Sequence, residues 1–161
     1  AGGVNVGVKN KQQVSSSFNE IIANAKNYKK EANIKGVLVQ QMIESARETI
    51  LGAKHDKLFG PLIMFGLGGI YVEALKDVVF RLAPIDEQEA MKMVESIKTY
   101  KILKGIRGQP PSDMKALIEC LLRLSQLVTD FPEITEFDMN PLLVLEEGKG
   151  ACAVDVRIGL A

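Results

Sequence analysis

Three oxygen-bearing side chains occupy alternate positions in the run Glu136-Phe137-Asp138-Met139-Asn140. In an extended strand alternate residues share one face, so the carboxylates of Glu136 and Asp138 and the carboxamide of Asn140 would point the same way. Such hard oxygen ligands suit Mg²⁺, which takes one or two protein carboxylates and otherwise binds water and substrate phosphates. The same spacing also fits a solvated strand face that ends in an Asn-Pro turn.

Asp155 and Arg157 repeat the strand period near the end of the chain. If this segment runs beside the strand of Glu136, Asp155 reaches the same site as Asn140. A metal-binding carboxylate beside a cationic phosphate contact is what a magnesium–nucleotide site needs. The alternative is a surface ion pair, which contributes little to stability.

A glycine-rich run, Gly66-Leu67-Gly68-Gly69, follows a short apolar segment. Three glycines in four residues would let backbone N–H groups approach an anion without interference from a Cβ atom. The run lacks both the Gly-Lys-Ser/Thr ending of a P-loop and the spacing of a Rossmann loop. A tight turn after a buried strand is the alternative interpretation.

Two arginines stand in unusual surroundings: Arg81 interrupts an apolar segment, and Arg107 lies between Gly105 and Gly108. Either guanidinium could clamp a phosphate through two parallel N–H bonds. Structural ion pairing is the alternative for both arginines.

The other reactive side chains form no catalytic or metal-binding pattern. Cys120 and Cys152 have no Cys or His at metal-ligand spacing, and no Ser or Cys has the partners of a nucleophilic triad. We expect both cysteines to be reduced and structural, as in a cytosolic protein. His55 lies among charged residues in a predicted turn and is expected to be an exposed bystander.

Composition narrows the classes of function. The 161 residues suit one domain, and 47% apolar with 25% charged residues is ordinary for a globular protein. Twenty basic and twenty acidic residues cancel, so charge gives no case for binding nucleic acid or a membrane surface. The longest uncharged run, residues 58–72, is too short to span a bilayer.

Periodicity predicts an α+β fold with a largely antiparallel sheet and helices packed on it. Apolar spacing indicates a helix over residues 14–28, Asp86 with Glu89 resembles a capping box that starts a second helix, and a third is expected from Ser112. The expected apolar face of that third helix is Met114, Leu117, Ile118, Leu121, Leu124 and Val128. Strands are expected at residues 4–9, 34–43, 48–53, 62–65, 77–83, 134–139, 142–145 and 151–158, with 48–53 the antiparallel neighbour of 34–43.

The chain begins with Ala1 and runs directly into an alternating, strand-like segment. A domain rarely opens inside a strand without a preceding partner. We therefore expect a truncated or processed chain, or one piece of a larger protein.

Several segments together resemble one family: the ATP-grasp subunit or domain of ADP-forming acetyl-CoA synthetases, relatives of succinyl-CoA synthetase. The similar segments follow one another along nearly the whole chain, at residues 36–42, 59–61, 65–69, 80–84, 107–108, 136–142 and 153–157. The resemblance implies a single, partial ATP-grasp domain over residues 1–161. It would lack an N-terminal strand with a nucleotide-contacting Lys and a loop with a His, and His55 lies in a different segment from that loop.

The resemblance also implies a reaction, in which acyl-CoA, ADP and phosphate interconvert with acid, CoA and ATP. A CoA-binding ligase subunit or domain would carry a phosphohistidine to this module, where ADP accepts the phosphoryl group. The implied cofactors are Mg²⁺ and ATP or ADP, and the implied assembly is a cytoplasmic hetero-oligomer without nucleic acid or membrane. Because the missing segment would bear part of the site, we expect the isolated chain to be inactive.

The resemblance assigns roles to individual residues. Asn140 and Asp155 match the Mg²⁺-binding positions, and Asp138 matches an acidic neighbour that assists them. Gln40, Gln41 and Met42 match the hinge whose backbone lies along the edge of the adenine. A looser match assigns phosphoryl transfer and nucleotide contact to Arg157, Gly66, Gly68 and Gly69. From its own surroundings, Arg81 is a further candidate for nucleotide contact.

Two other functions stay open. One is an ATP-grasp-like region of a protein acetyltransferase that binds or regulates without turnover, and the other is a structural fragment that binds no nucleotide. The presence of Asn140 and Asp155 favours retained metal chemistry over both.

Overall fold

The computed structural model describes residues 1–44, 46–69, 76–106 and 108–161. The chain divides into two compact units, residues 1–44 and the remainder of the chain.

The first unit is built around helix α1 (Lys11–Tyr28). The helix begins where the Asn10 side chain accepts a hydrogen bond from the Gln13 amide at 2.9 Å, as a helix N-cap should. Asn24 donates to the Gly2 carbonyl at 2.9 Å, which ties the preceding segment to the helix. Throughout α1, which the structure describes in full, no residue is buried, and even Phe18 is 48% exposed.

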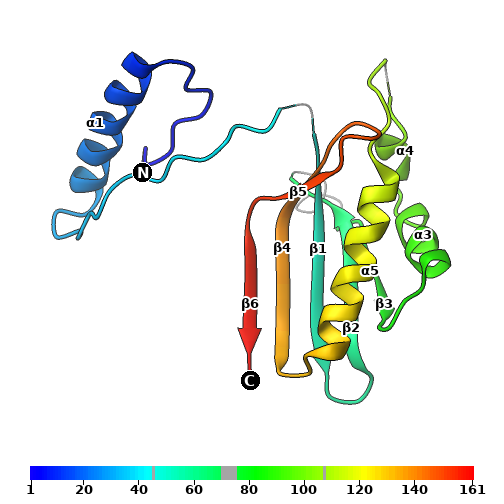
Figure 1. The fold of residues 1–161 in the computed structure, drawn as a ribbon. Coiled ribbons are helices and arrows are strands. Elements are labelled where there is room, and N and C mark those ends of the chain that lie inside the picture. Colours follow the sequence, from blue (N-terminus) through cyan, green and yellow to red (C-terminus); the bar gives the residue numbers. More distant parts are fainter. Residues whose placement is uncertain (45, 70–75, 107) are drawn as a thin grey trace. The chain divides into compact units, whose positions relative to one another are not determined.

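The second unit is an antiparallel sheet of six strands (Figure 1). The strands are β1 (Arg47–Asp56), β2 (Gly60–Leu67), β3 (Val78–Leu82), β4 (Ile134–Val144), β5 (Ala151–Ala153) and β6 (Val156–Leu160). Their order is β3-β2-β1-β4-β5, and β6 also pairs with β4. Because every pairing is antiparallel, residues directly opposite each other point to the same face of the sheet.

Helices cover one face of this sheet (Figure 1). They are α3 (Glu87–Glu95), α4 (Tyr100–Leu103) and α5 (Met114–Asp130). Helix α5 contacts β1, β2 and β4, and α3 contacts β2, β3 and α5. The helices and strands share one core in which Leu51, Phe65 and Leu121 are fully buried. Within the described residues, no helix combines the length and apolarity needed to cross a membrane.

Aspartates cap both long helices of the second unit. The Asp86 carboxylate accepts from the Glu89 amide at 2.8 Å, and the Asp113 carboxylate accepts from the Ala116 amide at 3.0 Å. Asp113 also accepts from the Gly150 amide at 2.9 Å, which joins the start of α5 to the turn before β5. The hydrogen bonds from these two amides, Ala116 first, hold the pKa of the Asp113 carboxyl below its usual value.

The predicted α+β fold and most of its elements are confirmed. The strands expected at residues 48–53, 62–65 and 77–83 are β1, β2 and β3, and α1, α3 and α5 lie where helices were predicted. Helix α5 begins at Met114 rather than at Ser112. The short helix α4 was not predicted.

The strands expected at residues 4–9 and 34–43 are wrong. Both segments are described in full and neither forms a strand, so β1 pairs with β2 and β4 instead. Alternation shows which side chains could share a face, but a strand also needs a second backbone for its N–H and C=O groups. The first unit, as described, contains no strand that could supply one.

The expected break at Pro141 is also wrong, because β4 runs unbroken through it. Between Thr49 and Leu51 the register with β1 shifts, so Asn140 and Pro141 form a bulge on β4. A bulge tolerates proline because the missing N–H need not join the ladder. The interruption lies instead in the segment that pairs with β4, between β5 and β6.

Candidate functional site

The sheet has a helix-free face, defined by the residues that point away from α3 and α5. One row of directly opposed residues crosses it from β3 to β6: Phe80, Met64, Gly52, Asp138 and Arg157. A Cβ atom on Gly52 would lie 3.0 Å from the Met64 Cε, so the Met64 side chain lies over the backbone of β1 on this face. The row therefore changes from apolar at β3 and β2 to charged at β4 and β6.

The polar end contains the residues that the sequence singled out. Asp138 lies directly opposite Arg157. The Asn140 amide donates to the Asp155 carbonyl at 3.0 Å, which places these two residues side by side across the β4 bulge. The predicted meeting of Asp155 and Asn140 is thus confirmed as a backbone arrangement. We call Asp138, Asn140 and Asp155 the oxygen-donor cluster.

The donor types of this cluster fit Mg²⁺. No group of three or more His, Cys, Asp or Glu side chains in the described part of the chain is placed to hold a metal ion. A cation at the oxygen-donor cluster would therefore have two carboxylates and one carboxamide from the protein. Mg²⁺ can bind with so few protein ligands because waters and substrate phosphates supply its remaining ligands.

The apolar end of the helix-free face was missed by sequence reasoning. Phe80 is 52% exposed and Leu82 is 50% exposed, and their opposed residues on β2 are Met64 and Leu62. An exposed aromatic and aliphatic surface next to charged residues is a usual feature of ligand sites. Only the register between β3 and β2 reveals that these residues share the face of Asp138.

The glycine-rich run lies at the end of β2, beside β1. The Gly68 amide donates to the Glu48 carbonyl at 2.7 Å, so this N–H is used within the fold. Gly69 has φ +61°, a conformation that favours glycine, and among the described residues a Cβ there would meet the Glu48 carboxylate at 3.0 Å. Gly66 is buried in β2, and a Cβ there would approach the Asp77 carbonyl at 2.8 Å. Packing or backbone conformation therefore accounts for a glycine at each of these positions. Their roles in nucleotide contact or phosphoryl transfer stay predictions.

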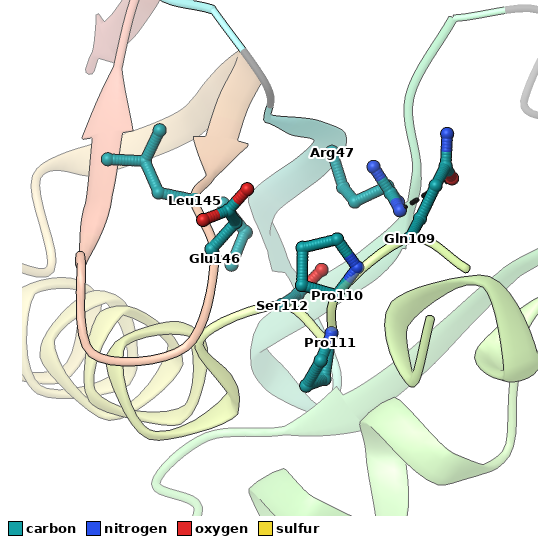
Figure 2. A pocket seen from close by; sticks show the side chains of 8 residues that line it. Arg47, Gln109, Pro110, Pro111, Ser112, Leu145 and Glu146 are labelled. Atoms are coloured by element: carbon teal, nitrogen blue, oxygen red, sulfur yellow. Dashed lines mark hydrogen bonds between the residues drawn. The ribbon is translucent and has the colours of Figure 1, made fainter. Parts of the chain in front are cut away.

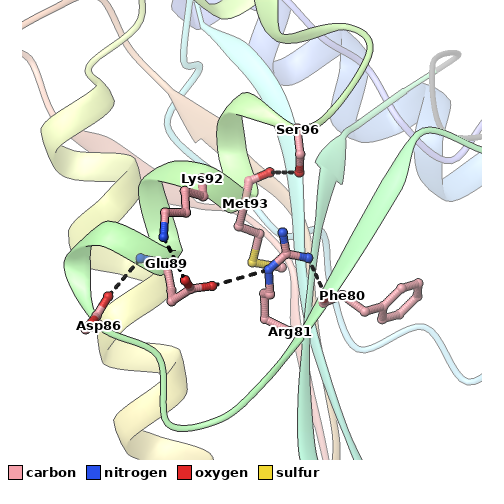
Figure 3. A network of polar contacts seen from close by, with 7 residues as sticks. All are labelled: Phe80, Arg81, Asp86, Glu89, Lys92, Met93 and Ser96. Atoms are coloured by element: carbon pink, nitrogen blue, oxygen red, sulfur yellow. Dashed lines mark hydrogen bonds and ion pairs between the residues drawn. The ribbon is translucent and has the colours of Figure 1, made fainter.

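Arg81 points away from the oxygen-donor cluster. It lies opposite Ile63 on the helix-covered face, and its Nε is 3.5 Å from the Glu89 carboxylate on α3. Its Nη1 donates to the Phe80 carbonyl at 2.8 Å. Figure 3 shows Arg81 directed toward Glu89 while the Phe80 ring projects the other way. The structure favours the ion-pairing role of Arg81, and a nucleotide contact by this residue is not supported by its position.

Residues 1–160 match the family model described as an ATP-grasp domain. The chain belongs to the ATP-grasp family. Its relatives include the 4-hydroxybutyrate–CoA ligase [ADP-forming] of Nitrosopumilus maritimus, 56% identical over 99% of this chain and 23% of that protein. They also include the acetate–CoA ligase [ADP-forming] I subunit beta of Pyrococcus furiosus, 44% identical over 98% of this chain and 67% of that subunit. The ATP-grasp chain thus spans about a quarter of the first relative and about two thirds of the second.

Solved structures agree with this assignment. Acetyl-coenzyme A synthetase 1 of Ca. Korarchaeum cryptofilum, in complex with coenzyme A, Ca-AMPCP and HgCl⁺, matches with a TM-score of 0.88 and 41% identity. The match covers 99% of this chain and 69% of that one. A structure of the same enzyme with Mg-AMPPCP, its phosphohistidine segment pointing towards the nucleotide binding site, matches with a TM-score of 0.84 and 38% identity over 99% of this chain and 68% of that one.

Some predicted site residues of the ATP-grasp chain are not joined to this face by the structure. Gln40, Gln41 and Met42 are in the first unit, in an extended segment where Met42 is 56% exposed. Their assignment to an adenine hinge stays a prediction. Arg107 lies outside the described residues.

Proposed function

We propose that this chain is the nucleotide-binding ATP-grasp part of an ADP-forming acyl-CoA ligase. In the proposed reaction it transfers a phosphoryl group between a phosphohistidine and ADP with Mg²⁺. The proposal rests on two observations: Asp138 lies directly opposite Arg157, and the Asn140 amide donates to the Asp155 carbonyl on the neighbouring segment. The names of the relatives support the overall reaction.

The two ends of the helix-free face suit the two ends of a nucleotide. The exposed apolar residues Phe80 and Leu82 offer a surface for a base, which gains from leaving water. The oxygen-donor cluster lies across Gly52 from Met64, at the other end of the row. Phosphates carried there would meet the charged residues, as phosphoryl transfer requires.

The chemistry asked of the protein is positioning and charge compensation. A bound Mg²⁺ would neutralise charge that develops on the transferred phosphoryl group. Asp138, Asn140 and Asp155 would hold that ion. The β4–β6 pairing positions Asp138, and the backbone hydrogen bond from Asn140 holds the segment of Asp155 beside the β4 bulge. The Arg157 guanidinium would donate to phosphate oxygens and favour the more highly charged transition state.

A partner must supply the phosphoryl group, because no histidine of this chain lies in the proposed site. His55 is exposed near the β1–β2 turn, opposite Pro61. We propose a CoA-binding ligase subunit or domain that carries a phosphohistidine to the helix-free face. The phosphohistidine segment named for the Korarchaeum structure supports this arrangement.

The test is ATP formation by the full-length enzyme that carries this chain. Purified enzyme receives acyl-CoA, ADP, phosphate and Mg²⁺, and ATP is followed over time. Arg157→Gln removes the proposed phosphate contact and should lower the rate about a hundredfold. The matched control is Arg123→Gln on α5, whose side chain is 76% exposed and pairs with Glu119 on the same helix.

Two results would contradict the proposal. The first is Mg²⁺-independent ATP formation, and the second is an Arg157→Gln enzyme as fast as the Arg123→Gln control. Thermal melting of both variants shows whether a lost rate reflects unfolding instead of lost contact.

A further inference from the structure

A small cavity of about 130 Å³ lies where β1 and β4 meet the loop before α5. Its walls include Arg47, Gln109, Ser112 and Glu146, with Pro110 and Pro111 between them (Figure 2). The volume is enough for several waters or a small ion. None of the residues assigned to the proposed nucleotide site lines this cavity.

Arg47 brings to the cavity a positive charge that no carboxylate of the described residues pairs with. Its Nη2 donates to the Gln109 side-chain oxygen at 2.7 Å, and Gln109 is neutral. Its Nε is buried and has no hydrogen-bond partner among the described residues. No carboxylate of the described residues lies within the 4.0 Å that an ion pair with Arg47 would need. A partly buried guanidinium without a counter-ion is costly, so the site favours an anion.

Ser112 supplies a second unpaired polar group. The residue is only 3% exposed, and its hydroxyl has no hydrogen-bond partner in the described part of the chain. A hydroxyl can donate to an anionic oxygen, and the prolines beside it bring no N–H of their own. The wall also holds the Glu146 carboxylate, which pairs with Lys149.

The cavity lies on the opposite side of β1 from the oxygen-donor cluster. Arg47 alternates with Thr49 and Leu51, both 0% exposed on the helix-covered face. Gly52 and Asp138 belong to the other face. A second cavity, of about 450 Å³, shares Arg47 and Gln109 and is bordered by Gly68 and Gly69.

We propose that Arg47 and Ser112 form a binding site for a small oxyanion, with phosphate as the probe of that class. The planar guanidinium matches two oxygens of such an anion, and the serine hydroxyl donates to a third. Gln109 holds the guanidinium in place. The argument for this site uses no residue of the oxygen-donor cluster.

Phosphate binding to this chain tests the proposal. Inorganic phosphate is titrated calorimetrically at constant ionic strength, without Mg²⁺ or nucleotide. Arg47→Gln should weaken binding roughly ten- to hundredfold, and Ser112→Ala roughly two- to tenfold. Arg123→Gln, at an exposed arginine of α5, should bind phosphate as the unmodified chain does. Glu146→Gln removes a carboxylate from the wall and should tighten binding, which unfolding could not do.

Adding ADP without Mg²⁺ shows whether the site binds free phosphate or a phosphate group of a nucleotide. If ADP displaces phosphate only when Arg47 is present, the site takes a nucleotide phosphate; if ADP does not displace it, the site takes the free anion. Either result supports the proposal. Should Arg47→Gln fail to fold, Arg47→Lys keeps the charge but loses the planar fork, and weaker binding is expected. Absence of phosphate binding, or equal affinity in the folded Arg47 variant and the Arg123 control, would overturn the site.

Discussion

At the scale of single residues, the proposed site depends on the register between β4 and the segment that ends in β6. Asp138 and Arg157 are directly opposed, and the Asn140 amide reaches the Asp155 carbonyl. Period-two spacing placed Asp138 with Asn140 on one strand face and Asp155 with Arg157 on another, and it brought Asp155 to Asn140 only on the condition that the two strands were neighbours. Sequence reasoning could not find the pairing of Arg47 with Gln109, 62 positions away. That contact depends on where the loop before α5 returns to the sheet.

Gly69→Ala should lower the free energy of unfolding by about 1 kcal/mol, because φ +61° strains any residue with a Cβ atom. Within the part of the chain that the structure describes, the added Cβ would contact the movable end of the Glu48 side chain. Urea unfolding measures the change. Gly3→Ala, where a Cβ meets nothing within 4 Å, is the matched control, and equal stability of the two variants would show that the left-handed conformation carries no cost.

Asp77 should make stability depend on pH. Burial alone would raise the pKa of its carboxyl, but hydrogen bonds from the Thr99 hydroxyl and the Lys98 and Thr99 amides outweigh burial and lower it. A lowered pKa in the folded state stabilises the fold above the usual value of 3.8, and this contribution disappears as pH falls through the folded-state pKa. Asp77→Asn should therefore cost about 1–3 kcal/mol near pH 7 and less below pH ~4. Urea unfolding across this range checks the trend, and a difference that is constant with pH would rule it out.

At the scale of elements, sequence periodicity predicted the long helices correctly. It was wrong for segments that could form a strand only beside a second strand. Helix α5 was predicted from its apolar stripe, and five of the six residues named for it are buried. Residues 4–9 alternate as well as any strand of the sheet, yet they form none. A helix satisfies its own backbone, whereas a strand depends on a neighbour that its own sequence does not reveal.

Leu121→Ala should test whether α5 holds the sheet. Leu121 is fully buried in the core shared by the helices and β1, β2 and β4. Truncation should lower the free energy of unfolding by about 2–5 kcal/mol through lost burial and a residual cavity. The control is Leu58→Ala in the β1–β2 turn, where the leucine is 87% exposed. Similar losses in both variants would contradict the packing role assigned to α5.

At the scale of the whole molecule, the two units differ in how they are stabilised. The second unit has one core shared by β1, β2, β4 and helices α3, α4 and α5, whereas α1 in the first unit buries no residue of its own. Hydrophobic burial is the main stabilising contribution in folding. The second unit should therefore carry the cooperative stability of the chain.

Expression of residues 46–161 alone should give a folded domain. Its thermal midpoint should lie close to that of the main transition of the whole chain, since it keeps the complete core. Residues 1–44 alone should show weak, non-cooperative helix melting, because a helix of this length is marginal without packing. Differential scanning calorimetry distinguishes these outcomes, and failure of residues 46–161 to fold would place essential stability in the first unit.

The central claim is that the oxygen-donor cluster binds a magnesium–nucleotide, and the Mg²⁺ dependence of ADP affinity tests it most directly. ADP is titrated into the chain with and without Mg²⁺. Asp155→Asn is compared with Asp130→Asn, the same change at an exposed residue that ends α5. We predict that Mg²⁺ strengthens ADP binding by the unmodified chain and by Asp130→Asn, and that Asp155→Asn loses about tenfold or more of this gain because an anionic ligand is removed. An Asp155→Asn chain that keeps the full Mg²⁺ effect, or an unmodified chain whose ADP binding ignores Mg²⁺, would contradict the claim.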